Sequence, residues 1–237
     1  MLTRLLSALP SQCMVCHAWP ARPVCMACAA RFARPLHRCG TCALPVPDGV
    51  ARCGACVRQA PPLHACLAAV AYAWPWAQAI QRFKFAQAPG LAAPLARLMA
   101  DAPGMAQALA DADWLLPLPL STQRLAERGY NPAHLLARQL LKALPATQAR
   151  LRADMLLRTR HSPPQSELPR AQRLKNVRGA FSVPAAQAPA LHERHVLLLD
   201  DVMTTGASLH EAARTLLTAG AKQVTALVLA RTEDASA

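Results

Sequence analysis

The chain has 237 residues, of which 53% are hydrophobic and 16% charged, with 21 proline and only 9 glycine residues. This composition excludes a disordered or collagen-like chain and predicts one large folded domain with a smaller appendage. The formal net charge of +13 favours polyanionic partners, either phosphorylated small molecules or nucleic acid. A genomic bias toward arginine explains the excess equally well, since 22 of the 26 cationic residues are arginine.

The sequence predicts no membrane insertion. Residues 59–81 carry no formal charge, but three prolines, three glutamines and His64 interrupt this run, which argues against a transmembrane helix. The apolar run in the first ten residues is too short for a signal peptide, and no small-residue cleavage site follows it. We therefore expect a soluble, cytoplasmic protein.

Eight of the nine cysteines lie in the first 56 residues as four Cys-x-x-Cys pairs, within a loop-rich segment that has little material for a core of its own. Two such pairs supply the four thiolates of a tetrahedral zinc site. Zinc is favoured over disulfides, which are rare in the cytoplasm, and over iron–sulfur clusters, which usually have other ligand spacings. Residues 1–62 are thus predicted to form a double zinc-ribbon module with two structural Zn²⁺ ions.

The pairing of these cysteines is open at this point. Short gaps between neighbouring pairs favour a sequential arrangement, and a cross-braced arrangement of first with third and second with fourth pair stays an alternative. In the sequential arrangement the ligands are Cys13, Cys16, Cys25 and Cys28 in one site, and Cys39, Cys42, Cys53 and Cys56 in the other.

From residue 63 onward the apolar spacing predicts a second, larger domain, residues 63–237. The run 67–73 predicts a buried strand, and the segments after Pro75 and over 91–102 predict two short helices. Residues 114–120 predict an extended run whose two prolines suit a strand end better than a central strand. Asn131 before Pro132 predicts the N-cap and first residue of another helix.

The C-terminal part predicts a strand, a helix and a strand in succession. Residues 150–178 hold eight cations and three prolines and predict an exposed, mobile loop. Residues 196–199 predict a buried strand, 207–219 a helix that ends before Gly220, and 224–230 another buried strand. This succession implies parallel strands, so we expect a doubly wound, parallel α/β sheet.

Asp200 and Asp201 directly follow the strand predicted over 196–199, and a turn rich in hydroxyl groups comes next. The carboxyl end of such a strand is where open α/β sheets bind ligands. The N–H groups of residues 204–208 suit a phosphate, and Gly206 allows a close approach. Two carboxylates beside a phosphate would repel it unless they contact hydroxyl groups or a Mg²⁺ ion instead. A phosphorylated ribose offers both a phosphate and vicinal hydroxyl groups.

Residues 197–208, Leu-Leu-Leu-Asp-Asp-Val-Met-Thr-Thr-Gly-Ala-Ser, resemble the phosphoribosyl diphosphate (PRPP) signature of type I phosphoribosyltransferases. Together with the cysteine pairs, the chain resembles the ComF family of competence-associated proteins, which joins a zinc ribbon to a phosphoribosyltransferase domain. Further matches are the segment 128–131 and the string 165–181. Two positions depart from the family pattern: Pro132 stands where glutamine is usual, and no glycine follows Lys84 closely.

The resemblance implies a role for each residue of the signature. Asp200 and Asp201 would be the catalytic candidates, holding the ribose hydroxyl groups with Mg²⁺ nearby, and residues 204–208 would hold the 5′-phosphate. The implied PRPP-binding residues are Asp200, Asp201, Val202, Met203, Thr204, Thr205, Gly206, Ala207 and Ser208, with Pro119, Leu120 and Ser121 at the diphosphate and Arg158 and Arg160 reaching over it.

Two compatible functions follow. The first is PRPP binding. The protein would be an enzyme if it also transfers the phosphoribosyl group to an acceptor, which the sequence does not identify. In that reaction Mg²⁺ and cationic side chains would stabilise the departing diphosphate. The second is a role in DNA uptake, favoured by the family's association with natural transformation, in which the basic zinc module engages single-stranded DNA and DNA-uptake proteins. A protein-interaction adaptor is a third alternative, which the seven arginines of residues 1–60 disfavour.

Overall fold

The computed structural model describes residues 11–159 and 177–233. The main sheet has five strands in the order β1-β7-β6-β2-β3, and every neighbouring pair is parallel. This confirms the predicted parallel α/β fold. The strands are β1 (Ala65–Ala71), β2 (Trp114–Pro117), β3 (Arg150–Leu151), β6 (His195–Met203) and β7 (Gln223–Arg231).

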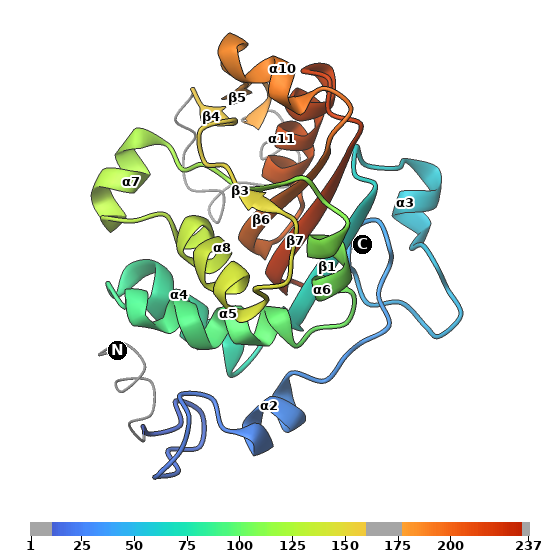
Figure 1. Ribbon diagram of the computed structural model, residues 1–237. Helices are drawn as coiled ribbons and strands as arrows, with labels where there is room; N and C mark the ends of the chain where they lie inside the picture. Colours follow the sequence, from blue (N-terminus) through green and yellow to red (C-terminus); the bar gives the residue numbers. More distant parts are fainter. Residues whose placement is uncertain (1–10, 160–176, 234–237) are drawn as a thin grey trace.

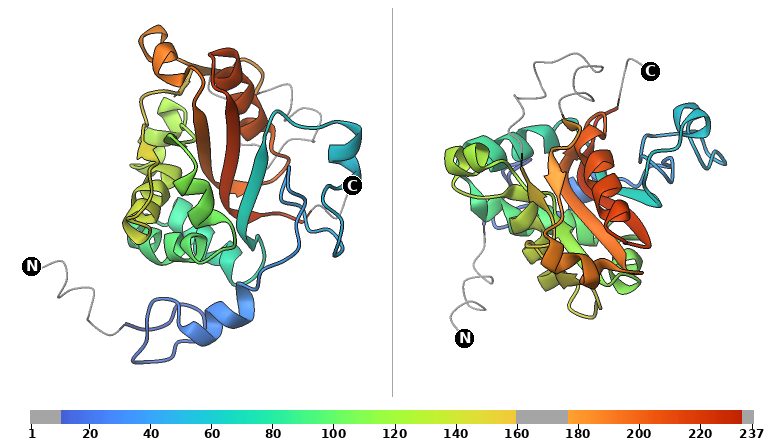
Figure 2. Two further views of the ribbon diagram at one scale, coloured as in Figure 1. Left: turned by 45° about the vertical axis from the view of Figure 1, so that its right-hand side comes forward. Right: turned by 90° about the horizontal axis from the view of Figure 1, so that it is seen from above.

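Helices cover both faces of this sheet (Figures 1 and 2). The central strand β6 is apolar on both faces, so both faces have to be covered. Leu197 and Leu199 belong to one apolar core, and Val196 and Leu198 belong to the other. The first core includes α4 (Trp76–Phe85), α5 (Ala92–Ala100), α6 (Met105–Ala110) and α8 (Pro132–Ala143), with the 3₁₀ turn η1 (Pro89–Leu91) before α5. The second includes α10 (Ala188–Leu191), which follows η3 (Ala185–Gln187), and α11 (Ala207–Thr218).

The central strand β6 is longer than predicted. It does not end at Leu199 but continues through both aspartates, because β7 keeps pairing with it as far as Met203. Its other neighbour, β2, pairs with it only as far as Leu199. From Asp200 onward β6 therefore has no strand on the β2 side, and that edge is open to a ligand.

The strand β2 lies inside the sheet, between β6 and β3, which the sequence did not indicate. Pro117 is nevertheless its last residue, and Pro119 lies beyond its end. The partner β3 pairs only with Trp114 and Leu115. A proline at position 117 therefore breaks no ladder hydrogen bond on that side.

A two-stranded antiparallel sheet of β4 (Leu157–Arg158) and β5 (Phe181–Ser182) flanks the basic segment. The prediction of an exposed loop over 150–178 is wrong at both ends, because Met155, Leu156 and Val177 are buried in the core shared with α11. These apolar side chains anchor the two ends of the segment. The part from 160 to 176 lies outside the described residues.

The two cysteine groups contact different parts of the main sheet domain (Figures 1 and 2). Next to α2 (Met26–Phe32), the first group reaches α4, where Trp76 Nε1 donates to Phe32 O at 2.7 Å. Next to α3 (Gly54–Arg58), the second group contributes Cys39, Cys42 and Cys56 to the core that contains α11. The division of the chain into 1–62 and 63–237 stays a prediction. None of the helices in the described parts of the chain is both long and apolar enough to cross a membrane.

Candidate functional site

A pocket of about 620 Å³ opens where β1, β2 and β6 end at their carboxyl termini. Its position follows from the fold, because parallel α/β sheets leave a crevice at this edge. The aspartates of β6 form one wall, the segment 118–120 after β2 another, and cations from α4 and α7 (Thr122–Arg128) complete it. The predicted site residues that line it are Pro119, Leu120, Arg158, Asp200, Asp201, Val202, Thr204 and Ser208.

The two aspartates differ in their surroundings. Asp201 is buried and forms an ion pair with Lys84, whose Nζ lies 2.8 Å from Asp201 Oδ1. Asp200 faces the pocket, and its Oδ1 accepts a hydrogen bond from the Asp201 N–H at 2.8 Å. Burial, and then the charge of Asp201, raises the pKa of the Asp200 carboxyl to about 7. A cation or a hydroxyl donor at Asp200 would therefore stabilise its ionised form.

The segment 204–208 leads from β6 into α11, and its last two residues are the first two of that helix. Gly206 has φ +79°, a left-handed conformation that side chains rarely adopt, and it directly precedes the helix. Within the described residues, the N–H groups of Thr204, Thr205 and Gly206 donate no hydrogen bond. Unpaired N–H groups at a helix N-terminus suit an anion such as a phosphate.

Not every predicted residue faces this pocket. Met203, Thr205 and Ala207 line a different cavity on the other side of the same loop, and Gly206 lines neither. Ser121 is buried and caps α7 by accepting a hydrogen bond from the Arg124 N–H at 3.4 Å. The predicted Arg160 lies outside the described residues. The role of all these residues in PRPP binding stays a prediction.

Three cations of this pocket, Lys84, Arg124 and Arg128, were missed as site residues in the sequence. Burial lowers the pKa of the Arg124 guanidinium, and the nearby Arg128 lowers it further. Burial also lowers the pKa of Arg158, followed by the charge of Arg124. Lys84 was noticed in the sequence, but only the fold joins it to Asp201, 117 positions along the chain. The only sequence signal for Arg124 is its place three residues after the cap Ser121.

The eight cysteines form two groups in the sequential arrangement, and within each group the sulfurs lie within 4.8 Å of one another. The Cys16 and Cys25 sulfurs are 3.7 Å apart, and those of Cys42 and Cys53 are 3.6 Å apart. Four sulfurs at ~2.3 Å from a tetrahedral Zn²⁺ would be ~3.8 Å apart, so both groups fit this ion. The Cys25 N–H donates to Cys13 Sγ at 3.4 Å, as expected where a knuckle turns backbone amides toward thiolates.

Two of the thiols are easily ionised in this arrangement. Although burial raises the pKa of Cys13 and of Cys39, backbone N–H donors lower it to about 6 in both. Thiolates are the form that binds a metal ion. Cys66, the ninth cysteine, is different: it is buried beside Met203, and burial raises the pKa of its thiol to about 12.

A carboxylate pair beside a glycine-containing loop, at the ends of parallel strands, defines a protein of the phosphoribosyltransferase class. In agreement, the phosphoribosyl transferase domain family matches residues 125–236. The DNA utilization protein YhgH of Escherichia coli O6:H1 is 31% identical to the chain over 233 residues, which cover 94% of this chain and 98% of the relative.

Competence protein F of Haemophilus influenzae is 31% identical over 213 residues, 88% of this chain and 85% of the relative. Competence protein ComFC of Bacillus subtilis is 36% identical over 118 residues, 49% of this chain and 44% of the relative. The chain belongs to the ComF family, to which these competence and DNA utilization proteins are related, as the signature predicted.

Proposed function

We propose that this protein binds PRPP together with Mg²⁺ in the pocket at the carboxyl end of β6. The observation that carries this proposal is the convergence of Asp200, Asp201, Thr204 and Ser208 on one pocket. In this arrangement the two carboxylates hold the ribose hydroxyl groups and the cation, and the loop holds the 5′-phosphate. Arg124 and Arg158 lie on the same pocket and offset the negative charge of the diphosphate.

Mg²⁺ would supply charge neutralisation of the diphosphate. The residues present fit this ion, because Asp200 and Asp201 offer the carboxylate oxygens that it prefers. Lys84 neutralises Asp201. This ion pair reduces the repulsion between the two neighbouring carboxylates.

Thermal unfolding with and without PRPP and Mg²⁺ tests the proposal. We expect a rise of the midpoint that grows with ligand concentration, since a ligand that binds only the folded state stabilises it. Asp200→Ala should abolish the rise, and Asp101→Ala, which removes an exposed carboxylate at the end of α5, should retain it. No rise in the wild-type protein at saturating PRPP would exclude the proposal.

Catalysis is a separate question from binding. A transferase would release diphosphate from PRPP when an acceptor is present, and a screen of nitrogen and oxygen nucleophiles for diphosphate release measures this directly. Release in the wild-type protein and none in Asp200→Ala would make the protein a phosphoribosyltransferase. PRPP binding without diphosphate release would mean that the protein recognises PRPP but does not catalyse its transfer, which is the non-catalytic alternative.

A second proposed function is single-stranded DNA binding by the first cysteine group, in DNA uptake. Trp19 is 64% exposed and Trp74 is 57% exposed, Trp74 packs edge-on against Phe32, and the guanidinium of Arg31 lies over the Phe32 ring. Exposed aromatic rings among arginines are the features on which unpaired bases stack. The names of the relatives, DNA utilization protein and competence protein, support this role.

Fluorescence anisotropy with a labelled oligothymidine tests DNA binding. We expect affinity to fall steeply as salt rises, and the double variant Trp19→Ala/Trp74→Ala to weaken binding at least tenfold. Val57→Ala removes a similarly exposed apolar side chain from the second cysteine group and serves as the control. A salt-independent signal, or no loss in the double variant, would exclude this surface.

We further propose that both cysteine groups hold Zn²⁺, that the protein acts in the cytoplasm, and that DNA-uptake proteins are among its partners. The sulfur spacing and the tetrahedral donor set support zinc. Metal analysis of freshly purified protein should find two equivalents of zinc per chain. One equivalent or none would contradict the proposal.

A further inference from the structure

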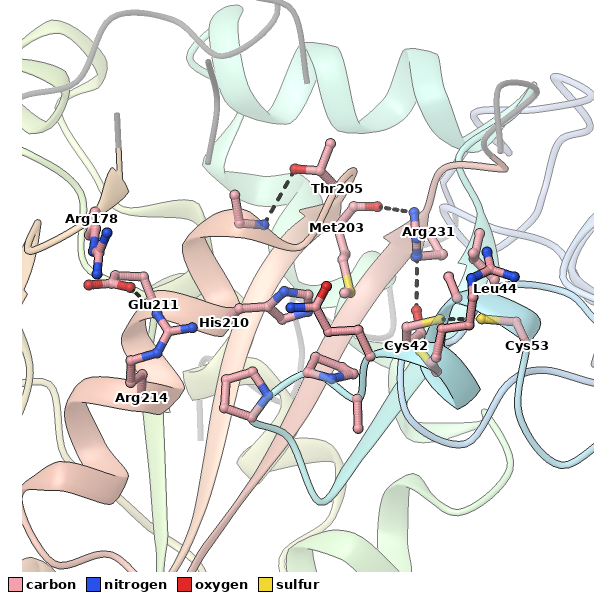
Figure 3. A pocket seen from close by; sticks show the side chains of 18 residues that line it. Cys42, Leu44, Cys53, Arg178, Met203, Thr205, His210, Glu211, Arg214 and Arg231 are labelled. Atoms are coloured by element: carbon pink, nitrogen blue, oxygen red, sulfur yellow. Dashed lines mark hydrogen bonds and ion pairs between the residues drawn. The ribbon is translucent and has the colours of Figure 1, made fainter. Parts of the chain in front are cut away.

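A second cavity, of about 720 Å³, lies behind the loop that forms the phosphoribosyl pocket. Figure 3 shows it between the second cysteine group, with Cys42, Cys53 and Leu44, and helix α11, with His210, Glu211 and Arg214. Its volume is typical of sites for small organic ligands. None of the proposed functions uses it.

The two cavities share a wall. Along the segment 202–208, Val202, Thr204 and Ser208 line the phosphoribosyl pocket, whereas Met203, Thr205 and Ala207 line this cavity. Val202 and Met203 diverge because they are successive residues of strand β6, whereas the other four residues belong to the turn and to the start of α11. The second cavity is therefore distinct from the phosphoribosyl pocket and in direct contact with it.

Cationic side chains dominate the lining of this cavity. Four arginines line it, and Glu211 is its one carboxylate. Glu211 already accepts hydrogen bonds from the Gly179 N–H and from Arg214, so it is largely neutralised. In the described part of the chain, no carboxylate lies within ion-pair distance of Arg58 or Arg178.

Arg231 is the most unusual of these arginines because it is only 3% exposed and has no carboxylate partner among the described residues. Its Nε donates to Cys42 O at 2.9 Å and its Nη1 to Met203 O at 3.1 Å, so carbonyl groups of both walls hold it. A buried guanidinium without an anion costs free energy. These carbonyl groups already accept the hydrogen bonds of Arg231, which leaves Arg58 and Arg178 for a ligand.

Much of the remaining surface of the cavity is apolar. Leu44, Ala55, Pro61, Pro62 and Met203 contribute to it, and Gln59 offers an amide that can donate and accept hydrogen bonds. An apolar surface with one amide suits a flat heterocycle, and the arginines suit a phosphate. The size, the charge and the apolar surface together describe a ligand with a planar ring and an anionic group.

We propose that this cavity binds a nucleoside phosphate, with the base against the segment 59–62 and the phosphate toward the arginines. Binding here does not require PRPP, so the inference stands apart from the proposed function. The ligand is either a free nucleotide or the terminal nucleotide of a strand, because both present the same base and phosphate.

Isothermal titration of the full-length, zinc-loaded protein with AMP, GMP, CMP and UMP tests the proposal. We expect at least one of them to bind more tightly than both its nucleoside and inorganic phosphate. Arg58→Ala/Arg178→Ala should weaken this binding at least tenfold, since each contact between a guanidinium and a phosphate is charge-assisted. The control Arg82→Ala/Arg138→Ala removes the same charge from exposed positions on α4 and α8, on the opposite face of the sheet.

A second variant guards against misfolding of the first. Ala55 is exposed and lines the cavity, so Ala55→Trp fills part of it without disturbing a core and should also weaken nucleotide binding. Zinc content and the unfolding midpoint show whether each variant is folded. A 5′-phosphorylated dinucleotide that binds as tightly as the mononucleotide identifies a strand end as the ligand, and weaker binding identifies a free nucleotide; both support the site.

Two results would overturn the proposal. One is the absence of binding by all four nucleotides at millimolar concentration. The other is binding that survives in Arg58→Ala/Arg178→Ala and in Ala55→Trp but is lost in Asp200→Asn/Arg124→Ala, because the nucleotide would then occupy the phosphoribosyl pocket. Failure of PRPP to bind, by contrast, would overturn the proposed function and leave this site untouched.

Discussion

Asp200 and Asp201 are adjacent in the chain, but the structure gives them different partners. Because successive residues of a strand point to opposite faces, only one of them can share the environment of the preceding Leu199. Asp201 pairs with Lys84, and Asp200 accepts from the Asp201 N–H while its pKa is raised to about 7. We infer that Asp200 is the carboxylate whose charge responds to ligand binding.

This difference predicts how PRPP affinity depends on pH. Asp200 must lose its proton to hold Mg²⁺, so below pH 7 protonation competes with the ligand. We compare the affinity of the wild type for PRPP with Mg²⁺ to that of Asp200→Asn. The wild-type affinity divided by the variant affinity should be largest above pH 7 and should fall about tenfold per pH unit below pH 7. The ligand's own titration affects both proteins alike, so titration calorimetry from pH 8 to pH 5.5 isolates this carboxyl. An unchanged ratio over that range would contradict the assignment.

Gly206 predicts a loss of stability when a side chain is added. Its φ is +79°, and a Cβ there would lie 2.5 Å from Met203 Cε and 2.6 Å from His210 Nε2. Both atoms are the far ends of side chains that line the second cavity, so a shift of these side chains relieves part of the crowding. Gly206→Ala should therefore lower the free energy of unfolding by about 2 kcal/mol in urea denaturation.

Gly129 provides the matched control for this substitution. It has a similar φ of +75° at the end of α7, but a Cβ there would meet nothing within 4 Å. Gly129→Ala should cost only the backbone strain, about 1 kcal/mol. Equal losses in the two variants would show that crowding by Met203 and His210 contributes nothing.

At the level of elements, unequal strand lengths create the site. Since β2 stops at Pro117 while β6 and β7 continue, the last four residues of β6 have no strand beside them on the β2 edge. The chain after β2 then turns into α7 and α8 around the opening. Asn131 links this turn to the helix: its Oδ1 accepts from the Ala133 N–H at 2.9 Å, and its Nδ2 donates to Leu118 O at 3.0 Å.

Asn131 therefore has two separable functions. Asn131→Ala removes both the cap of α8 and the bond to Leu118, and we expect a loss of about 2 kcal/mol in urea denaturation. Asn131→Ser keeps a capping oxygen but is too short to reach Leu118, so its loss should be about 1 kcal/mol. If serine costs as much as alanine, the cap contributes little and the bond to the pocket wall is the stabilising contact.

At the level of the whole molecule, the two cysteine groups differ in how they join the main domain. Cys39, Cys42 and Cys56 are buried members of the core that includes α11, and the Cys66 N–H donates to Gly40 O at 2.9 Å. The first group instead contributes partly buried neighbours, such as Val24 and Phe32, to the core on the other face.

Loss of metal should therefore have unequal effects. Cys42→Ser opens the second group and should lower the unfolding midpoint of the whole protein, because that group is continuous with the core of the main domain. Cys16→Ser, at an exposed position, should release the metal with a smaller change. Circular dichroism melting with parallel zinc analysis measures both, and equal shifts would contradict this view of the second group.

Much of the fold could be predicted from local patterns. The helix that begins at Asn131 and the helix after Gly206 agree with their caps and apolar spacing, and the parallel sheet follows from the alternation of strands and helices. What local patterns could not indicate is which strands are neighbours. Thus the run 114–120, with its two prolines, was expected to be a strand end rather than a central strand, yet β2 lies inside the sheet. Strand order depends on contacts between distant segments, which local patterns do not reveal.

The same division holds for the candidate site. The aspartate pair, the segment 204–208 and the cysteine pairs are each short stretches of sequence, so their residue types and spacing were enough to predict the family and the chemistry expected of it. The Lys84–Asp201 pair, the place of Arg124 and the second cavity join residues far apart in the chain. Only the tertiary structure could decide these, because the charge of a side chain is encoded locally, whereas its neighbours and its burial arise when separate elements pack together.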